Sequence, residues 1–379
     1  MTPVPDHPAP ASQPGSPRVF IACGGTGGHL FPGLAVAGAL RAHGIASLLG
    51  ISPKAVDRTA TEGRGDVETV VLPARPMPRP WSPSFPAFVG SLRATYRACR
   101  ASWERHGVRA VLGMGGFTSL VPVWAGRRAH LPVFLHDSNA IPGKANRLAG
   151  RWADTVFLGM EDAARWFRQA RTETVGTPVR EEFLSLPAQA EARRKFGLDP
   201  ERRTVLVLGG SQGSRALNRA TLDAAGLLPA GSLQILMLTG PELADETERL
   251  VAAQKPGVPV VVVPFCHDMP AAYACADLAV ARAGASTLSE LAVCGLPAVL
   301  VPYPHAADDH QTANARSLAD ARAAHLLPER ELGGEALAAC WRDLLGGSDP
   351  LSQMSAAMRS LAFPHAAETM ARRIAASLA

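Results

Sequence analysis

The sequence predicts an α/β protein made of two parallel sheets that follow one another along the chain. Short runs rich in valine, isoleucine and leucine alternate with helical stretches, which is typical of parallel α/β sheets. The alternation restarts near the middle, and each half opens with a strand followed by a glycine-rich turn. A length of 379 residues also exceeds one typical hydrophobic core and fits two domains.

The expected strands form two groups with the same scheme. In the first half they are Arg18–Ala22, Ala46–Leu49, Glu68–Leu72, Ala110–Leu112, Pro132–Leu135, Thr155–Leu158 and Glu173–Val175. In the second half they are Thr204–Leu208, Leu233–Leu238, Val258–Val263, Leu278–Val280, Ala298–Val301 and Ala324–Leu326. Ligands of open α/β sheets bind beyond the carboxyl ends of the strands, so the turns there are the first places to search for a site.

The domain boundaries follow from breaks in this pattern. We expect residues 1–17 to be a disordered tail, because they are rich in proline, alanine and serine and lack the apolar segment of a signal peptide. The first domain should span 18–177 and the second 178–362, with the join at Gly176–Arg180, where a strand gives way to a proline turn. The last segment, 363–379, contains an amphipathic helix at Ala366–Leu378 that we expect to pack back onto the first domain.

Composition limits the class of protein. The sequence has no uninterrupted apolar stretch of the ~18 residues that a membrane span needs. Its six cysteines show no C-x-x-C pattern and no ligand-like spacing with histidine, which indicates a reduced, cytosolic context. We therefore expect neither a metal ion nor a cofactor.

One segment carries the excess of positive charge. Residues 75–109 contain seven arginines and one acid, Glu104, in a chain whose net charge is +5. Tryptophan, tyrosine and phenylalanine side chains lie among the arginines, as in surfaces that bind anionic lipid headgroups. The alternative is a solvated helix behind a proline-rich loop. Nucleic acid is disfavoured, because no nucleic-acid motif accompanies the charge.

The first glycine-rich turn is Gly24–His29, directly after the first strand. A glycine backbone that opens a helix suits an anion, because unbonded N–H groups and the helix dipole point toward it. The turn is neither a dinucleotide fingerprint, since Ser47–Ser52 holds no ribose-binding acid, nor a Walker A loop, since no Lys-Ser/Thr follows. It is either a binding loop or a tight strand–helix corner. His29 is either a general base or a side chain that caps the turn.

The second turn, Gly284–Glu290, has more polar chemistry. Ser286 and Thr287 offer hydroxyls to phosphate oxygens, and Glu290 follows on the same helical face as Ser286, where a carboxylate can accept ribose hydroxyls. The alternative is a serine N-cap with a glutamate one turn later. Three further strand-end loops are candidates: Gly209–Ser214, Gly113–Ser119 and His136–Asn139. Without a metal, helix termini, backbone amides and Arg180 would carry the charge of a leaving diphosphate.

These motifs, in this order from about residue 18 to the C-terminus, closely resemble the bacterial lipid II-forming N-acetylglucosaminyltransferases, the MurG family. The resemblance is in Gly24–His29, Gly113–Phe117, His136–Asn139, Gly209–Gly213, Arg282–Glu290 and His310–Ala315. It implies two facing Rossmann-like domains of the GT-B type and an inverting transfer of GlcNAc from UDP-GlcNAc to the C4 hydroxyl of the MurNAc of lipid I. It also implies peripheral attachment to the cytoplasmic face of the inner membrane, with anionic lipids and other cell-wall synthesis and division proteins as partners.

Site residues follow from the resemblance position by position. It implies that His29 is a base or an acceptor-site residue. Our hypothesis is that the catalytic base is His29, or less readily Asp137. For the donor, the resemblance implies that the sugar and diphosphate face Thr26, Gly27 and Gly28, and that the diphosphate is approached by Arg180 and Ser211. It implies that the uracil meets the backbone of Cys266 and that GlcNAc is contacted by Asn139 and Gln311. It also implies that phosphate and ribose are held by Ala285, Ser286, Thr287, Leu288, Ser289 and Glu290. On the acceptor side it implies Gly115, Gly116, Phe117 and Thr118.

The chain also departs from the family pattern. His136-Asp137-Ser138-Asn139 stands where the family usually has His-Glu-Gln-Asn, Phe117 stands where it has tyrosine, and residues 74–80 lack its Gly-Arg-Gly-Lys-like run. These changes keep open a transferase of the same scaffold that acts on another lipid or natural-product acceptor. A sugar-nucleotide epimerase and a non-catalytic UDP-sugar-binding protein are more distant alternatives.

Overall fold

The computed structural model describes residues 18–54, 57–58, 61, 67–79, 81–347 and 349–378. The chain divides into two compact units. Of the described residues, unit 1 contains those up to Ser138, then Pro142–Pro178 and those from His365 onward, and unit 2 contains those of Asn139–Ile141 and Val179–Pro364. The short segment Asn139–Ile141 thus belongs to unit 2, although the sequence analysis placed it in the first domain.

Unit 1 is built on a parallel sheet that has seven strands within the described residues, in the order β3-β2-β1-β4-β5-β6-β7. The strands are β1 (Arg18–Ala22), β2 (Ala46–Ile51), β3 (Glu68–Val71), β4 (Val108–Gly113), β5 (Val133–Asp137), β6 (Thr155–Leu158) and β7 (Arg171–Thr174). Its helices are α1 (Gly27–Ala42), α3 (Phe85–His106), α4 (Phe117–Arg128), α5 (Lys144–Ala149), the 3-10 helix η1 (Glu161–Trp166) and α14 (Ala366–Ala376).

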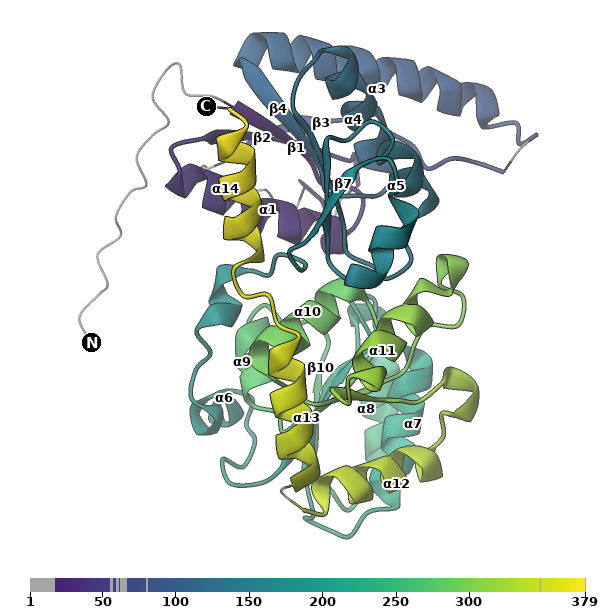
Figure 1. Cartoon of the computed structure of the whole chain (residues 1–379). Coiled ribbons are helices and arrows are strands. Elements are labelled where there is room, and N and C mark those ends of the chain that lie inside the picture. Colours follow the sequence, from purple (N-terminus) through teal and green to yellow (C-terminus); the bar gives the residue numbers. More distant parts are fainter. Residues whose placement is uncertain are drawn as a thin grey trace. The chain divides into compact units, whose positions relative to one another are not determined.

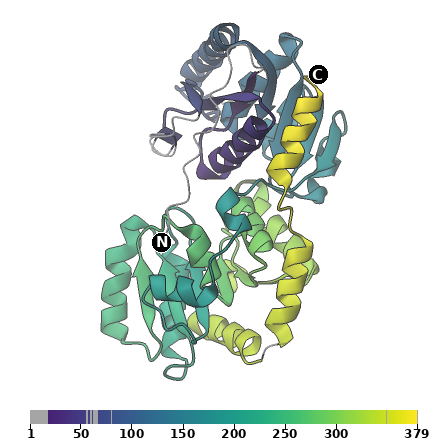
Figure 2. The ribbon, with the colours of Figure 1, turned by 90° about the vertical axis from the view of Figure 1, so that its left-hand side faces the viewer.

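Both faces of this sheet are covered, because successive residues of a strand point to opposite sides. Val19 and Ile21 of β1 pack with α1 and with Met370 and Ile374 of α14. Phe20, between them, packs on the other side with residues of α3. The helix α14, yellow in Figure 1, lies beside α1 in that view and in Figure 2. The last helix of the chain therefore completes the core of the first unit.

Unit 2 repeats the scheme with six parallel strands among the described residues, in the order β10-β9-β8-β11-β12-β13. The strands are β8 (Thr204–Leu208), β9 (Gln234–Leu238), β10 (Val260–Val263), β11 (Leu278–Ala281), β12 (Ala298–Leu300) and β13 (Ala324–Leu326). Its helices are η2 (Glu181–Leu184), α6 (Gln189–Lys195), α7 (Arg215–Gly226), η3 (Pro241–Leu243), α8 (Ala244–Gln254), α9 (Met269–Ala274), α10 (Ala285–Cys294), η4 (Ala307–Asp309), α11 (His310–Asp320), η5 (Glu329–Glu331), α12 (Gly334–Leu345) and α13 (Asp349–Ser360).

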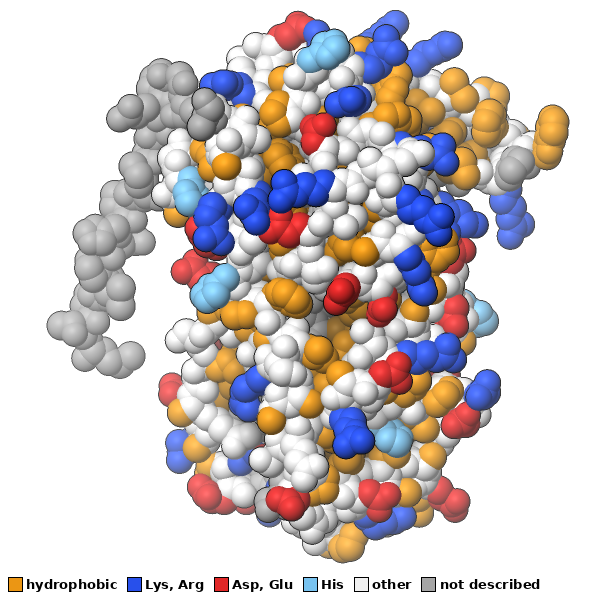
Figure 3. Space-filling model, viewed as in Figure 1, with side chains coloured by type: hydrophobic (Ala, Val, Ile, Leu, Met, Phe, Trp, Pro, Cys, Tyr) orange, Lys and Arg blue, Asp and Glu red, His pale blue; other side chains and the backbone are white. Residues whose placement is uncertain are grey.

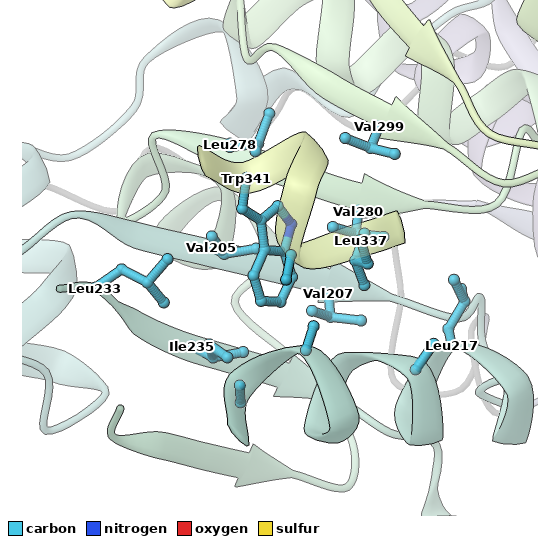
Figure 4. Packing of buried hydrophobic residues seen from close by; sticks show 14 of the residues in the cluster. Val205, Val207, Leu217, Leu233, Ile235, Leu278, Val280, Val299, Leu337 and Trp341 are labelled. Atoms are coloured by element: carbon cyan, nitrogen blue, oxygen red, sulfur yellow. The ribbon is translucent and has the colours of Figure 1, made fainter. Parts of the chain in front are cut away.

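The core of unit 2 centres on Trp341 of α12. Its indole is fully buried and packs over Val205 and Val207 of β8, as Figure 4 shows. Ile235 of β9 and Leu337 of α12 close the same cluster. A large aromatic side chain over the central strands fixes α12 to this face of the sheet.

The predicted fold class is confirmed: both sheets are parallel and doubly wound. Each expected strand is present, with ends that differ by up to two residues. The strand order reverses between β1 and β4 in unit 1 and between β8 and β11 in unit 2. Loops that leave neighbouring strands in opposite directions open a crevice at such a point, where α/β proteins bind ligands. No helix of the described residues is long and apolar enough to cross a membrane.

Candidate functional site

Two glycine turns meet at the reversal point of unit 1, one after β1 and one after β4. Gly25, whose φ is +110°, is held through both of its backbone polar groups. Its N–H donates to Asp57 Oδ2 at 2.7 Å, and its carbonyl accepts from Lys54 Nζ at 2.8 Å. The first turn is therefore fixed by the segment that follows β2.

Asp57 is a residue that the sequence analysis missed. Its carboxylate is buried and also accepts from the Ser52 amide at 2.9 Å and the Ser52 hydroxyl at 2.5 Å. A dinucleotide-binding protein would have its ribose ligand within Ser47–Ser52, after the second strand, where this chain has no acid. An acid lies five residues further on, and it binds the protein's own glycine turn.

His29, in the first turn of α1, lies against the second glycine turn. A Cβ added to Gly115 would come within 3.0 Å of His29 Cδ2, and one added to Gly116 within 3.2 Å of His29 Cε1. His29 Nδ1 is 2.9 Å from the Thr26 hydroxyl. Burial lowers the pKa of His29 to about 4, with Asp57 acting in the opposite direction. The ring is thus neutral at pH 7 and can accept a proton.

Thr26, Gly27 and Gly28 form the start of α1. Thr26 and Gly28 are exposed, and Gly27 is half-buried. The first amides of a helix have no intrahelical acceptor, so this end of α1 presents donors and a partial positive charge. The residue types and their exposure suit an anionic ligand.

Asp137, at the end of β5, is buried rather than presented to a ligand. Its Oδ2 accepts from Asn146 Nδ2 at 2.7 Å, and the same amide nitrogen lies 3.3 Å from His136 O. Asn146 also lies against Gly115, and the sequence analysis missed it. Asp137 thus positions Asn146 beside the glycine turn, an arrangement that suits support of the loop better than proton abstraction.

His136 is fully buried in the same strand. Its Nε2 lies 3.1 Å from Gly176 O, and because a carbonyl only accepts, Nε2 carries the proton. Burial lowers the pKa of His136 to about 4. A neutral imidazole therefore links β5 to the end of the segment that follows β7.

The residues expected on the acceptor side mainly hold the two turns together. The ring of Phe117 packs on Gly25, where an added Cβ would lie 3.0 Å from it. Thr118 is buried, and its hydroxyl donates to Gly24 O at 2.6 Å. This is a correction for Thr118, whose hydroxyl is directed into the protein. Gly115 and Gly116 have φ values of +103° and +75°, which favour glycine.

The reversal point of unit 2 carries the loops after β8 and β11. A Cβ at Gly213 would lie 1.7 Å from Thr239 O, so only glycine fits there. Ser214 caps α7, accepting from Leu217 N at 3.4 Å and from Arg282 Nη2 at 2.7 Å. Arg282 thereby links the two loops. Ser211, at the tip of the first loop, is exposed.

Helix α10 begins at Ala285 after Gly284. Ser286, Thr287, Ser289 and Glu290 are half-buried, whereas Ala285 and Leu288 face the interior. Leu288 is 2% exposed and its amide donates to Gly284 O, so it offers neither side chain nor amide to a ligand. This corrects the expectation for Leu288. The amides of the preceding three residues are the donors at this helix end.

Glu290 accepts a hydrogen bond of 2.7 Å at Oε2 from the hydroxyl of Tyr273. Burial raises the pKa of Glu290, while Tyr273 and Arg180 lower it. Burial raises the pKa of Cys266, and the charge of Arg180, half-buried at the start of unit 2, acts in the opposite direction. The Cys266 thiol lies 3.2 Å from Asp268 O.

The last donor-site candidates lie on α11 and beside it. Gln311 Oε1 accepts from the amides of Tyr303 at 2.9 Å and Ala283 at 3.2 Å. Asn314, one turn later and fully buried, accepts from Ala140 N at 2.9 Å and donates to Asn139 Oδ1 at 3.1 Å. Asn314 Nδ2 also donates to Ala283 O at 3.1 Å, so Asn139 is connected through Asn314 to the loop that precedes α10. Within the described residues, no group of three or more His, Cys, Asp or Glu side chains could hold a metal ion.

Two Rossmann-like units, each with glycine turns at its reversal point, form the architecture of GT-B glycosyltransferases, and the comparisons with known proteins agree. Residues 19–158 match the glycosyltransferase family 28 N-terminal domain, and residues 204–370 match the family 28 C-terminal domain. The chain belongs to glycosyltransferase family 28 and is a glycosyltransferase.

Curated relatives align over nearly the whole chain. The UDP-N-acetylglucosamine--N-acetylmuramyl-(pentapeptide) pyrophosphoryl-undecaprenol N-acetylglucosamine transferase of Acidothermus cellulolyticus is 37% identical over 93% of this chain and 96% of its own. The enzyme of the same name from Halorhodospira halophila is 40% identical with the same coverage. The crystal structure of Acinetobacter baumannii MurG is 28% identical, with a TM-score of 0.76 over 95% of this chain and 99% of its own.

Proposed function

We propose that this enzyme transfers GlcNAc from UDP-GlcNAc to the C4 hydroxyl of the MurNAc of lipid I, which yields lipid II for peptidoglycan synthesis. The observation that carries the proposal is full-length similarity to relatives that bear this activity in their names. The grouping of Glu290, Arg180 and Cys266 in unit 2, and of His29 with two glycine turns in unit 1, supports it.

For the donor, the start of α10 takes the diphosphate. Backbone amides and the helix dipole at Ala285–Thr287 supply positive potential, and the exposed Ser211 and the guanidinium of Arg180 add donors. Glu290 accepts the ribose hydroxyls, and the backbone at Cys266 meets the uracil. Asn139 and Gln311, both anchored around the loop before α10, contact the GlcNAc.

For the reaction, the acceptor oxygen attacks the anomeric carbon as the bond to the UDP oxygen breaks, so the configuration inverts. The proton of the C4 hydroxyl passes to His29 Nε2. The tautomer that donates from Nδ1 to the Thr26 hydroxyl leaves Nε2 as an acceptor, and burial keeps the ring neutral at pH 7. UDP leaves with its charge balanced by amides and Arg180.

We further propose that unit 1 attaches peripherally to the cytoplasmic face of the inner membrane. Trp81 is 99% exposed and Met77 70% exposed, and Phe85 follows at the start of α3. Arg75, Arg79, Arg93 and Arg97 are exposed in the same segment. Figure 3 shows hydrophobic and basic side chains gathered around α3 and the segment before it. Each arginine near an anionic surface contributes about 1 kcal/mol of attraction, and the aromatic side chains add apolar burial. Cell-wall synthesis and division proteins at that membrane are proposed partners.

The test is a transfer assay with radiolabelled UDP-GlcNAc. We expect label in a lipid-linked disaccharide when lipid I is the acceptor and little when soluble or other lipid acceptors replace it. Transfer to another acceptor in preference to lipid I would instead favour the alternative left open by Asp137, Ser138 and residues 74–80.

A variant tests the donor site separately. Glu290→Ala should weaken UDP-GlcNAc binding about 10- to 100-fold, because hydrogen bonds to a charged acceptor contribute roughly 1.5–3 kcal/mol. Titration calorimetry measures the dissociation constant, with Glu331→Ala, an exposed glutamate of η5 in the same unit, as control. Unchanged affinity in Glu290→Ala would contradict the ribose assignment.

A further inference from the structure

We infer that Tyr273 is a positioning residue for nucleotide recognition: its hydroxyl holds the carboxylate of Glu290 in the orientation that accepts a ribose diol. The inference rests on the proposed role of Glu290. It gives a function to a buried tyrosine that lies outside the motifs, on a neighbouring helix 17 residues earlier in the chain. It also implies that Tyr273 contributes to the preference for ribonucleotides over deoxyribonucleotides.

The hydroxyl of Tyr273 is directed at one carboxylate oxygen. It donates to Glu290 Oε2 at 2.7 Å, while the ring is 2% exposed. A buried phenol requires a polar partner, and a carboxylate is a stronger acceptor than a backbone carbonyl. The bond occupies one lone pair of Oε2 and leaves the carboxylate with Oε1 and a further lone pair, enough for two vicinal hydroxyls.

The ring cannot readily move away from this position. Phe183 packs edge-on against Tyr273 with ring centroids 5.2 Å apart, and the guanidinium of Arg180 lies over Phe183 at 5.1 Å. The helix α9 that carries Tyr273 is capped by Asp268, whose Oδ1 accepts from Ala271 N at 3.0 Å. A rigid donor lets Glu290 bind without first losing side-chain freedom, which lowers the entropic cost of binding.

The same hydrogen bond favours the ionised form of Glu290. Burial raises the pKa of Glu290, and the hydroxyl of Tyr273 and the charge of Arg180 counteract that rise. Cys294, one turn later on the same helix, has its pKa raised to about 12 by burial and is neutral at working pH. Without the hydroxyl, the pKa of Glu290 rises further. Protonation then removes acceptor capacity, so nucleotide affinity falls at a higher pH than in the unaltered enzyme.

The experiment removes the phenol oxygen of Tyr273 from the protein and both hydroxyl oxygens of the ribose from the nucleotide. Binding of UDP and of 2′,3′-dideoxy-UDP to the full chain is measured by calorimetry for the unaltered protein, Tyr273→Phe and Tyr96→Phe. Tyr96 lies on α3 of unit 1 and serves as the matched control. We expect Tyr273→Phe to weaken UDP about 3- to 10-fold, as one hydrogen bond predicts, and to leave the dideoxy nucleotide within twofold. The acid limb of UDP affinity should move to higher pH, and kcat at saturating donor should stay near its original value while KM rises.

Two results would overturn the inference. An equal loss of affinity for both nucleotides would show that Tyr273 only maintains the fold. An unchanged affinity for UDP in Tyr273→Phe, with Glu290→Ala still weakened, would show that Glu290 needs no support from it. If Glu290→Ala binds UDP normally as well, the nucleotide assignment itself fails, and the inference fails with it.

Discussion

At the scale of single residues, His29 has the geometry of a base, and its environment sets the pKa of its ring. Its ring lies on the Gly115–Gly116 backbone and its Nδ1 is 2.9 Å from the Thr26 hydroxyl. We expect His29→Gln to lower kcat by a factor of about 10²–10⁴, the usual contribution of a general base, and to change the UDP dissociation constant less than twofold. Steady-state kinetics and calorimetry measure the two quantities. Thr26→Ser, which keeps the hydroxyl, is the control, and a kcat near normal in His29→Gln would exclude the base.

The pH dependence gives an independent check on the same residue. A pKa of about 4, lowered by burial, means that His29 gains its proton, and loses its ability to accept one, only as pH falls through about 4. The limb of the kcat profile that belongs to His29 should therefore lie below pH 5. A limb near pH 6.5, the ordinary value for histidine, would show that the ring is solvated during turnover.

At the residue level, the sequence can single out a candidate where the residue is part of a local motif. His29 and Glu290 stand next to glycine turns, so a short window identifies them as candidates. The sequence did not identify Asp57 and Tyr273 as candidates, because their roles depend on partners 32 and 17 residues away in the chain. Leu288 and Thr118 were misassigned because proximity to a motif does not say which side of the helix faces inward.

At the scale of elements, the strands were predicted well and the roles of glycines were not. The second strand was expected to end at Leu49, but β2 continues to Ile51. A Cβ added at Gly50 would lie 2.5 Å from the ring of Phe20. The role of this glycine is therefore to leave room for a packed side chain within a strand. The helix α1 begins at Gly27, although glycine has a low helix propensity. Local propensity yields there to the tertiary position of the turn.

The loop after β8 separates two effects of glycine on stability. Gly210 and Gly213 both have positive φ, +87° and +74°. An added Cβ at Gly210 meets nothing within 4 Å, whereas at Gly213 it would lie 1.7 Å from Thr239 O. Gly210→Ala should cost about 1 kcal/mol of unfolding free energy, the strain of a left-handed residue. Gly213→Ala should cost at least about 3 kcal/mol, since backbone must shift. Urea unfolding followed by circular dichroism measures both, and equal losses would contradict the clash.

At the scale of the whole molecule, the chain leaves unit 1, builds unit 2 and returns to unit 1 with α14. Met370 and Ile374 of α14 are fully buried in the cluster that also contains Val19 and Ile21 of β1. Arg373, on the outer side of the same helix, makes a two-pronged ion pair with Glu173 at 2.9–3.1 Å. The stability of the first unit therefore depends on the last residues of the chain.

Calorimetry with a bound nucleotide can assign this dependence to one unit. Met370→Ala removes a buried side chain and should cost about 2–5 kcal/mol. Arg373→Ala breaks a surface ion pair that is screened by solvent, so its loss of unfolding free energy should be much smaller. The loss belongs to unit 1, because α14 packs there. By the proposed function UDP binds unit 2, so it raises the unfolding temperature of unit 2 and not that of unit 1. The unfolding transition whose temperature UDP does not change should therefore shift to a lower temperature in Met370→Ala. In Arg373→Ala its temperature should stay nearly unchanged. If the UDP-sensitive transition falls instead, or if both variants lose equal stability, α14 does not stabilise the first unit through its buried face.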